Sequence, residues 1–147
     1  MPDAAAERLV IFPGTQAILY SLLAHLAAPG DVVLTEALTF PGIKAAAHRL
    51  GIKLAGVAMD DGGILPDALA SACRRLKPKA VYLIPTLHNP TTATLSPERR
   101  SAIAAIIRKA NTVLIEDDAY GLLERAISAV TVQGARYPEH LQALVGR

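Results

Sequence analysis

Three consecutive acids, Glu116, Asp117 and Asp118, follow the apolar run that begins at Val113. Adjacent carboxylates repel one another, and a carboxylate is costly to bury unless it has a partner. The apolar run is typical of a buried strand, so the acids come where a strand ends, and α/β proteins bind ligands at strand ends. We therefore predict a cationic partner for at least one of them. The alternative interpretation is an acidic loop that faces water.

Polar and aromatic side chains also follow the other apolar runs. A Gly-Thr-Gln turn comes after "RLVIF", the segment "EALTFPG" comes after the second run, and "PTLHNPTTATLS" comes after "AVYLI". Because ligands bind outside the carboxyl ends of parallel strands, we expect these segments to converge on one cleft. The candidate residues are Gly14, Thr15, Gln16, Phe40, Asn89, Asp117 and Tyr120.

Apolar strand patterns alternate with helical patterns along the whole chain. The helical patterns open with Pro or Ser and close with Gly or basic residues, which is the usual punctuation of helices. Near-continuous apolar strands that alternate with helices predict an α/β fold, a three-layer α/β/α sandwich with a mostly parallel sheet. The predicted strands cover residues 8–12, 31–35, 53–58, 80–84 and 112–116, and the predicted helices cover 15–28, 41–51, 66–76 and 96–110.

Composition limits the classes of function. The 147 residues are 52% hydrophobic and 19% charged, which indicates a globular chain with one sizeable core. The net charge of +2 gives no reason to expect nucleic acid or an acidic membrane surface as a partner. The single cysteine, the lack of a transmembrane-length apolar run and a start without a signal-peptide layout lead us to expect a cytoplasmic protein.

Four segments carry a family resemblance when they are taken in order. They are "PGTQAI", "PGDVVLTEALTFPG", "YLIPTLHNPTTATLSPERR" and "VLIEDDAYGLL". Together they resemble the large-domain core of fold-type-I pyridoxal-phosphate (PLP) enzymes of the class I/II aminotransferase group. The nearest types are 2-aminoadipate and multisubstrate aminotransferases and the aminotransferase-like half of MocR-type GntR regulators. We predict a partial large domain over residues 1–125, followed by a segment, 126–147, that departs from the family pattern.

The resemblance implies that PLP is held at both ends. Gly14, Thr15 and Gln16 would bind its phosphate through the free N–H groups of a helix start. Phe40 would stack on the pyridine ring. Taken alone, the turn is better interpreted as an ordinary helix start, and Phe40 as a core aromatic.

The same resemblance gives three further residues a role at the ring. Asn89 and Tyr120 would bond the cofactor's O3′, and Asp117 would pair with the pyridine nitrogen, keeping it protonated so that it is a better electron sink. The usual loop is Asn-Pro-Thr-Gly, and this chain has Thr92 in place of that glycine. If the backbone there needs a positive φ, we expect Thr92 to be strained and the loop to be shifted.

The lysine that the chemistry needs is not where the family has it. PLP enzymes bind the cofactor as a lysine Schiff base, and in this family that lysine follows the Asp-x-x-Tyr segment by some tens of residues. The lysines here are Lys44, Lys53, Lys77, Lys79 and Lys109, and all of them precede Asp117. We therefore assign no catalytic residue and no metal site, and we expect no aminotransferase activity from the chain alone.

Three functions remain open at this point. The chain is a fragment of an aminotransferase acting on an amino acid and a keto acid, the effector-binding domain of a MocR/GntR-type regulator, or a degenerate remnant. We also expect a homo-oligomer, because a domain taken from a larger dimeric enzyme leaves apolar surface uncovered.

Overall fold

The structure is a computed structural model that describes residues 9–121. The helices are α1 (Thr15–Leu26), α2 (Pro41–Leu50), α3 (Pro66–Leu76) and α4 (Pro97–Ala110). The strands are β1 (Val32–Glu36), β2 (Lys53–Val57), β3 (Met59–Asp60), β4 (Gly63–Ile64), β5 (Ala80–Leu83) and β6 (Val113–Glu116). Four of the strands form a parallel sheet in the order β2-β1-β5-β6, and β3 pairs with β4 as a short antiparallel hairpin.

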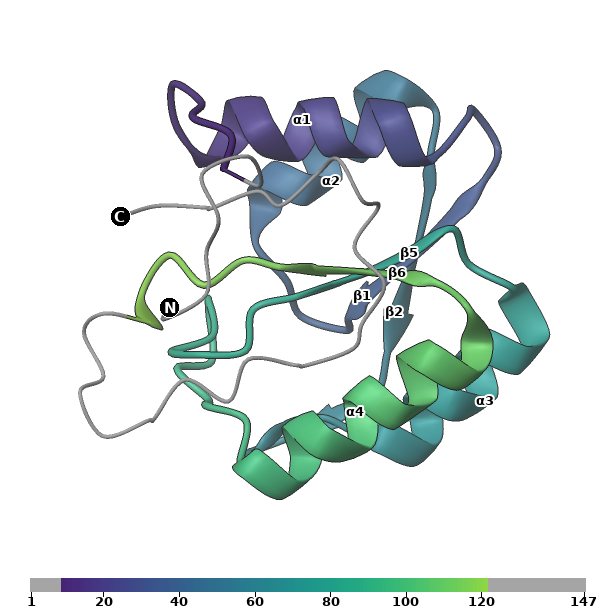
Figure 1. Ribbon diagram of the computed structural model, residues 1–147, viewed down its shortest axis with the longest axis vertical. Coiled ribbons are helices and arrows are strands. Elements are labelled where there is room, and N and C mark those ends of the chain that lie inside the picture. The colour runs from purple at the N-terminus through teal and green to yellow at the C-terminus, as the bar shows by residue number, and fades with distance from the viewer. Residues whose placement is uncertain (1–8, 122–147) are drawn as a thin grey trace.

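The sheet separates two helical layers. Helices α1 and α2 cover one face, and α3 and α4 cover the other (Figure 1). The period of two along each strand divides the core between them: Val33 and Tyr82 pack toward α1 and α2, whereas Leu34 and Val81 pack toward α3 and α4. The predicted three-layer sandwich with a parallel sheet is therefore confirmed.

The helix boundaries follow the punctuation in the sequence. Pro41, Pro66 and Pro97 are each the first residue of a helix, where the missing N–H is not needed. Ser96 caps α4, because its hydroxyl oxygen accepts a hydrogen bond from the backbone N–H of Arg99 at 3.2 Å. These predictions are confirmed to within a few residues.

The strand predicted at 8–12 is wrong over its described part. Among residues 9–12, Val10 makes a single bridge and no strand forms. Ile11 is 95% exposed, and the carbonyl of Phe12 accepts a hydrogen bond from the N–H of Gly14 at 2.8 Å. This turn directs the chain into α1, so the apolar run leads to a helix without joining the sheet.

The direction of the connections reverses between β1 and β5. Helix α2 links β1 to β2 on one face, whereas α3 carries the chain from β2 across β1 to β5 on the other face (Figure 1). Between β1 and β5, the residues Val33 and Leu34 are paired, whereas β1 and β2 pair along all of β1. The two central strands thus diverge toward their carboxyl ends, and such a reversal point is where open α/β sheets bind ligands.

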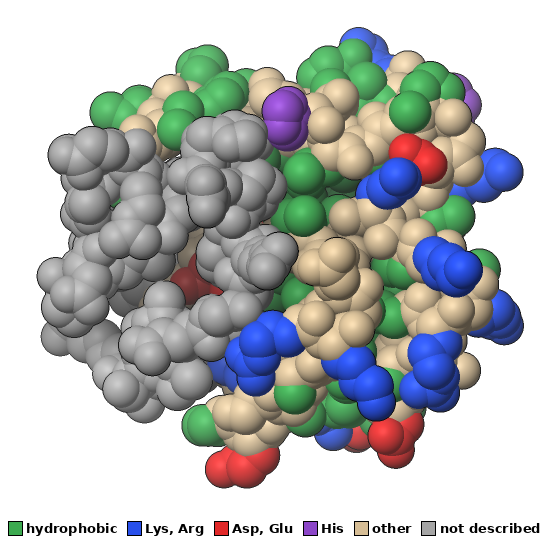
Figure 2. Space-filling view, turned by 45° about the vertical axis from the view of Figure 1, so that its right-hand side comes forward, with side chains coloured by type: hydrophobic (Ala, Val, Ile, Leu, Met, Phe, Trp, Pro, Cys, Tyr) green, Lys and Arg blue, Asp and Glu red, His purple; other side chains and the backbone are tan. Residues whose placement is uncertain are grey.

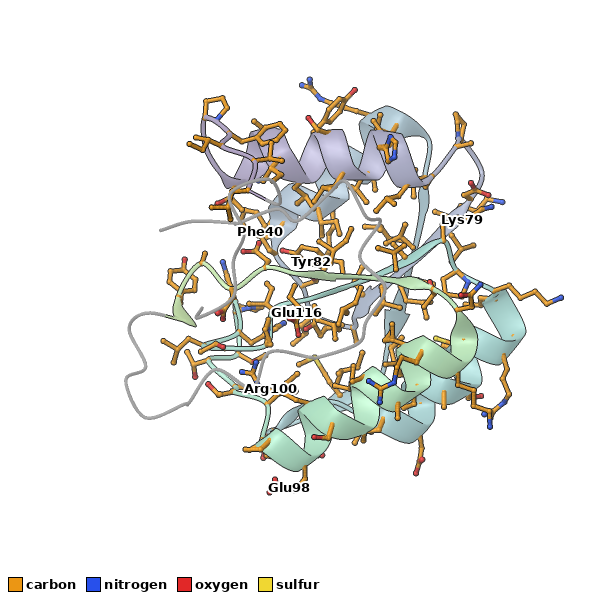
Figure 3. All side chains as sticks on the ribbon, in the orientation of Figure 1. Phe40, Lys79, Tyr82, Glu98, Arg100 and Glu116 are labelled. Carbon is orange, nitrogen blue, oxygen red and sulfur yellow. The ribbon has the colours of Figure 1, made fainter. Side chains whose placement is uncertain are left out.

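A buried arginine holds the loop between β5 and α4. Arg100 is 7% exposed, and its guanidinium donates to the carbonyls of Leu95 (3.1 Å) and Pro85 (2.9 Å) and to the hydroxyl of Thr86 (2.9 Å). These acceptors lie at the two ends of the loop, and Figure 3 shows Arg100 between α4 and this segment. The position of the loop, which contains the predicted Asn89, therefore depends on Arg100.

Two further features describe the surface. Within residues 9–121, no helix is both long and apolar enough to cross a membrane. Figure 2 shows hydrophobic side chains at the surface of the α1 and α2 layer, and Tyr20 of α1 is 43% exposed.

We predict that Arg100→Met destabilises the chain by about 3 kcal/mol, because it removes the guanidinium donor from the buried Leu95 carbonyl and Thr86 hydroxyl and leaves the Pro85 carbonyl with the N–H of Leu95 as its donor. Urea unfolding followed by circular dichroism measures this loss. Arg99→Met is the matched control, since Arg99 pairs with the exposed Asp60 and water replaces that contact. Equal losses in the two variants would contradict the assigned role of Arg100.

Candidate functional site

Four buried polar atoms have no hydrogen-bond partner within the described residues. They are Glu36 Oε2, Thr39 Oγ1, His88 Nε2 and Asp117 Oδ1. Glu36 ends β1 and Thr39 follows it, His88 lies in the loop after β5, and Asp117 directly follows β6. All four thus belong to the carboxyl edge of the sheet. A buried polar group without a partner costs about 1–3 kcal/mol, so this concentration marks the edge as a candidate ligand site.

Asp117 is held in one orientation by the strand beside it. Its N–H continues the ladder to the carbonyl of Leu83 at 2.9 Å, and its Oδ2 accepts a hydrogen bond from the Tyr82 hydroxyl at 2.7 Å. Burial, and then the charge of Asp117, raise the pKa of Tyr82 far above its ordinary value, so this hydroxyl stays a donor. The other oxygen, Oδ1, is buried and has no hydrogen-bond partner within residues 9–121.

The three acids at the end of β6 lie in different surroundings. Asp117 is 6% exposed, Glu116 is half-buried, and Asp118 is exposed. Within residues 9–121, the hydrogen-bond partner of Asp117 is the hydroxyl of Tyr82 rather than a cation. The predicted cationic partner of Asp117 therefore remains a prediction about a ligand.

Glu36 bridges the gap between the diverging strands. Its Oε1 accepts a hydrogen bond from the N–H of Ile84 at 2.9 Å, beyond the point where the β1–β5 ladder ends. Burial raises the pKa of Glu36 to about 7, while the bond from Ile84 lowers it and the nearby Asp117 adds a smaller increase. Near neutral pH, Glu36 therefore exchanges a proton between two similarly populated states.

His88 connects Glu36 to the loop after β5. Its Nε2 lies 3.9 Å from Glu36 Oε1, and its Nδ1 lies 2.8 Å from the Thr91 hydroxyl. Burial lowers the pKa of His88, and the Leu38 carbonyl acts in the opposite direction. The neutral ring is thus favoured, and Glu36 and His88 form a close polar contact rather than a strong ion pair.

The loop that contains Asn89 closes on itself despite its unusual sequence. The N–H of Thr92 donates to the carbonyl of His88 at 2.6 Å, and the N–H of His88 donates to the carbonyl of Ala93 at 2.8 Å. Thr92 has a φ of 61°, so it takes the left-handed conformation that a glycine would adopt. The condition under which we expect strain at Thr92, a positive φ, is therefore met, and a shift of the loop stays a prediction. Asn89 is half-buried in this loop, and the Asn89–Pro90 peptide bond is cis.

The starts of α1 and α2 meet at the same side of the sheet. Gly14 precedes α1 with a φ of 103°, and it has no side chain that could cap the N–H groups of the first turn. A Cβ added at Gly42 would overlap both the Gln16 amide nitrogen and the Phe40 ring, so these two side chains lie together against Gly42. Figure 3 shows Phe40 on the α1 and α2 side, close to the end of the sheet where β6 finishes.

The structure thus joins the predicted residues into two groups. Gln16 and Phe40 form one group, and Asp117 forms the other with Tyr82 and Glu36, two residues that sequence reasoning missed. Tyr120 is 43% exposed beside the turn after Asp117. The convergence of all seven predicted residues on one cofactor remains a prediction.

A cavity of about 350 Å³ adjoins this edge on the β2 side of β1. Glu36, Thr39, Lys44 and His48 contribute to its lining. It lies between β1, β2 and α2, whereas Asp117 lies beyond β5, so the cavity neighbours the Asp117 site and does not contain it.

Most of the lysines lie at the other end of the sheet. Lys79 precedes β5, and Figure 3 shows it at the end of the molecule opposite Phe40. Lys53 begins β2, Lys77 follows α3, and Lys109 is in the last turn of α4. Lys44, in the first half of α2, is the exception.

A parallel sheet with a reversal point, an uncapped helix start and a buried acid with one free oxygen defines a ligand-binding core of the α/β class. The sequence matches the family Aminotransferase class I and II over residues 2–144, and the chain belongs to this family.

Individual relatives agree with this assignment. The chain is 33% identical over 123 residues to the HTH-type transcriptional regulator YdeF of Bacillus subtilis, covering 84% of this chain and 27% of that protein. Its fold matches an archaeal alanine:glyoxylate aminotransferase with a TM-score of 0.72 and 37% identity, covering 75% of this chain and 28% of the other. It also matches LysN, an α-aminoadipate aminotransferase of Thermus thermophilus complexed with N-(5'-phosphopyridoxyl)-L-leucine, with a TM-score of 0.70, 30% identity, and coverage of 73% and 28%. The chain therefore spans about a quarter of the length of these relatives.

We predict that Thr92→Gly stabilises the chain by about 0.5–1 kcal/mol. A β-branched residue is strained in the left-handed region, and the free energy of this strain exceeds the additional backbone entropy that glycine loses on folding. Ala93→Gly is the control, because Ala93 has no positive φ, and we expect a loss of about 0.5–1 kcal/mol there. Urea midpoints of the two variants give the comparison, and a destabilised Thr92→Gly variant would contradict the strain.

We predict that Glu36→Gln removes a pH dependence of stability. The pKa of Glu36 is about 7 in the folded chain and 4.5 in the reference state, so its contribution is fully present below 4.5 and is lost as pH rises through 7. This difference in pKa corresponds to about 3 kcal/mol. Glutamine keeps the acceptor for Ile84 and carries no charge, so the variant should be more stable than the wild type at pH 8 and not at pH 5.

The free energies of unfolding in urea at the two pH values test this. Burial lowers the pKa of His88, so its ring is neutral at pH 8 and Glu36 is the group that distinguishes the two proteins there. Glu98→Gln is the control. The pKa of Glu98 is lowered by its own backbone N–H and by the Ser96 side chain, so removing this carboxylate should not make the variant more stable than wild type at pH 8. A constant difference between Glu36→Gln and wild type across pH would show that Glu36 does not titrate as described.

Proposed function

We propose that this chain forms the cofactor-binding part of a PLP-dependent aminotransferase, which transfers an amino group between an amino acid and a 2-keto acid. The observation that carries this proposal is the pair of oxygens of Asp117. Oδ2 is fixed by the buried Tyr82 hydroxyl, and Oδ1 is buried without a partner at the carboxyl edge of the sheet. A protonated ring nitrogen is a donor that would satisfy Oδ1.

The residues present fit the two ends of this cofactor. The N–H groups at the start of α1, after Gly14, would bind the phosphate, as uncapped helix starts bind anions. Phe40 would lie against the ring, and Asn89 and Tyr120 would bond its O3′. PLP, when bound, supplies an electron sink for the α-carbon of the substrate.

Asp117 has the central role among the residues of this chain. Its carboxylate would hold a proton on the ring nitrogen, and burial strengthens that interaction because the local dielectric constant is low. Tyr82 keeps the carboxylate from rotating away, since its hydroxyl stays protonated. The orientation of Asp117 is therefore set before any ligand arrives.

We further propose that this chain binds PLP reversibly and does not catalyse transamination by itself. The reaction needs a lysine amine beside the substrate α-carbon to move its proton. No lysine follows Tyr120 in the sequence, and Lys53, Lys77, Lys79 and Lys109 lie toward the amino edge.

A second function has support from one relative. YdeF is named as an HTH-type transcriptional regulator, and the chain matches 27% of it. An effector-binding domain would use the same edge of the sheet to bind PLP and an amino acid without turnover. We also propose self-association through exposed hydrophobic side chains of the α1 and α2 layer (Figure 2).

Binding of pyridoxine 5'-phosphate tests the cofactor site. This compound has the ring and phosphate of PLP but no aldehyde, so it does not react with lysines. We expect Asp117→Asn to weaken its binding about 10- to 100-fold, because a hydrogen bond to a charged group is worth about 1.5–3 kcal/mol. Calorimetric titration gives the affinity. Asp118→Asn, one residue away and exposed, is the matched control, and equal effects of both substitutions would refute the role of Asp117.

Reduction with borohydride tests the absence of a catalytic lysine. We expect that the chain mixed with PLP and reduced shows no single lysine labelled in stoichiometric amount by peptide mass mapping. Partial labelling of the exposed Lys44 is compatible with this. An assay with several amino donors should show no turnover. Stoichiometric labelling of one lysine together with turnover would show that another lysine has taken the role.

A further inference from the structure

Glu36 is a buried carboxyl group for which the proposed function has no role. Sequence reasoning assigned it no part, yet it is 2% exposed, and its Oε2 has no partner within the described residues. It lies where β1 and β5 separate, two residues after the last paired residue of β1, Leu34. The bond from Ile84 to its Oε1 is the next link between the two strands.

Titratable groups from every neighbouring element face Glu36. Asp117, after β6, and Tyr82, in β5, interact with it electrostatically, and His88 of the following loop lies 3.9 Å away. On the α2 side, Lys44 and His48 line the cavity to which Glu36 also contributes. Glu36 therefore has basic side chains of α2 beside it in the cavity and, on the β5 side, the acid that would hold the ring nitrogen.

The proximity of two buried carboxyl groups has a consequence for ligand binding. Asp117 disfavours the ionised form of Glu36, because like charges repel in a medium of low dielectric constant. A ligand that brings a positive charge to Asp117 removes part of this repulsion. By linkage, ionised Glu36 then favours that ligand to the same extent as the ligand favours ionised Glu36.

We propose that Glu36 is a positioning residue of the cofactor site, which fixes the crevice between β1 and β5 and, when ionised, reinforces the hold of Asp117 on a protonated ring nitrogen. This inference rests on the proposed function. In this proposal Asp117 contacts the ring nitrogen directly, and Glu36 is a second carboxyl group whose charge depends on pH. Glu36 acts through Asp117, so its signature is a pH-dependent affinity and not a loss of binding at every pH.

Calorimetric titration of the 147-residue chain with pyridoxine 5'-phosphate at pH 6 and pH 8 tests the inference. We expect Glu36→Gln to bind about tenfold more weakly than wild type at pH 8, where Glu36 is ionised, as a charge at a separation of several Å allows. At pH 6 the two proteins should differ by less than about twofold, since Glu36 is then mostly neutral. The titration of the free ligand is common to both proteins and cancels in the ratio, and His88, whose pKa is lowered by burial, is neutral at pH 8. Glu98→Gln, at the exposed start of α4, should match wild type at both pH values.

A measurement on the wild-type chain keeps the test independent of variant folding. Carbon-13 NMR of the Glu36 carboxyl gives its pKa with and without pyridoxine 5'-phosphate. We expect the ligand to lower this pKa from about 7 by about one unit, the equivalent of the tenfold change in affinity. A pKa unchanged by the ligand would overturn the inference.

The outcomes separate the two proposals. If Asp117→Asn weakens binding and the ratio of wild type to Glu36→Gln is the same at both pH values, the inference about Glu36 fails and the proposed function stands. If pyridoxine 5'-phosphate does not bind, or binds equally to Asp117→Asn, both proposals fail.

Discussion

The separation of β1 from β5 is the constraint on which the rest of the molecule depends. Two parallel strands that paired along their full length would leave no room between their carboxyl ends. Here the β1–β5 pairing stops at Leu34 and Val81. Beyond this point β1 leads into α2 on one face of the sheet, and β5 leads into α4 on the other. A backbone N–H that would have been used in the ladder, that of Ile84, becomes available to the side chain of Glu36. The crevice and the polar groups beside it thus arise from the same break in pairing.

A buried polar contact crosses that break, and others lie beside it. A core built of leucine and valine alone would close such a gap, because apolar side chains pack to fill space. The carboxyl of Glu36 instead connects β1 to the backbone after β5 across it. Beside it, the Tyr82 hydroxyl links β5 to Asp117, and the Arg100 guanidinium links the two ends of the loop after β5. Each of these groups loses hydration on burial, and each recovers only part of it through the bonds it makes. The buried polar atoms of the described residues that have no hydrogen-bond partner lower the free energy of unfolding, and they lie at the edge of the candidate ligand site.

Local patterns predict most of the fold, and they predict less of the site. The proline residues at helix starts and the apolar strands are read within a few residues of sequence, so α2, α3 and α4 follow directly. The strand prediction for residues 8–12 was wrong because the composition of this run resembles a strand, while the turn at Gly14 commits the chain to α1.

Asp117 was selected as a candidate site residue because its position after an apolar strand is a local signal. Its partner Tyr82 is 35 residues away, and Glu36 is 48 residues from Ile84, so no local pattern shows that these groups meet. Tyr82 in particular looks like one more apolar residue of β5.

Most of the lysines lie at the opposite end of the sheet from the buried polar groups of the candidate site. The ends of parallel strands differ: the carboxyl edge gathers Glu36, Asp117 and their partners, whereas Lys53 and Lys79 begin the strands at the opposite edge. An amine at the amino edge is separated from Asp117 by the length of a strand, and at about 3.3 Å per residue even a four-residue strand exceeds the reach of a hydrogen bond several-fold. Lys44 lies nearer, but it lines a cavity on the β2 side of β1, with two strands between it and β6. The buried polar groups of the described residues and most of the lysines thus lie at opposite ends of the sheet, because a parallel sheet places all strand starts at one edge and all strand ends at the other.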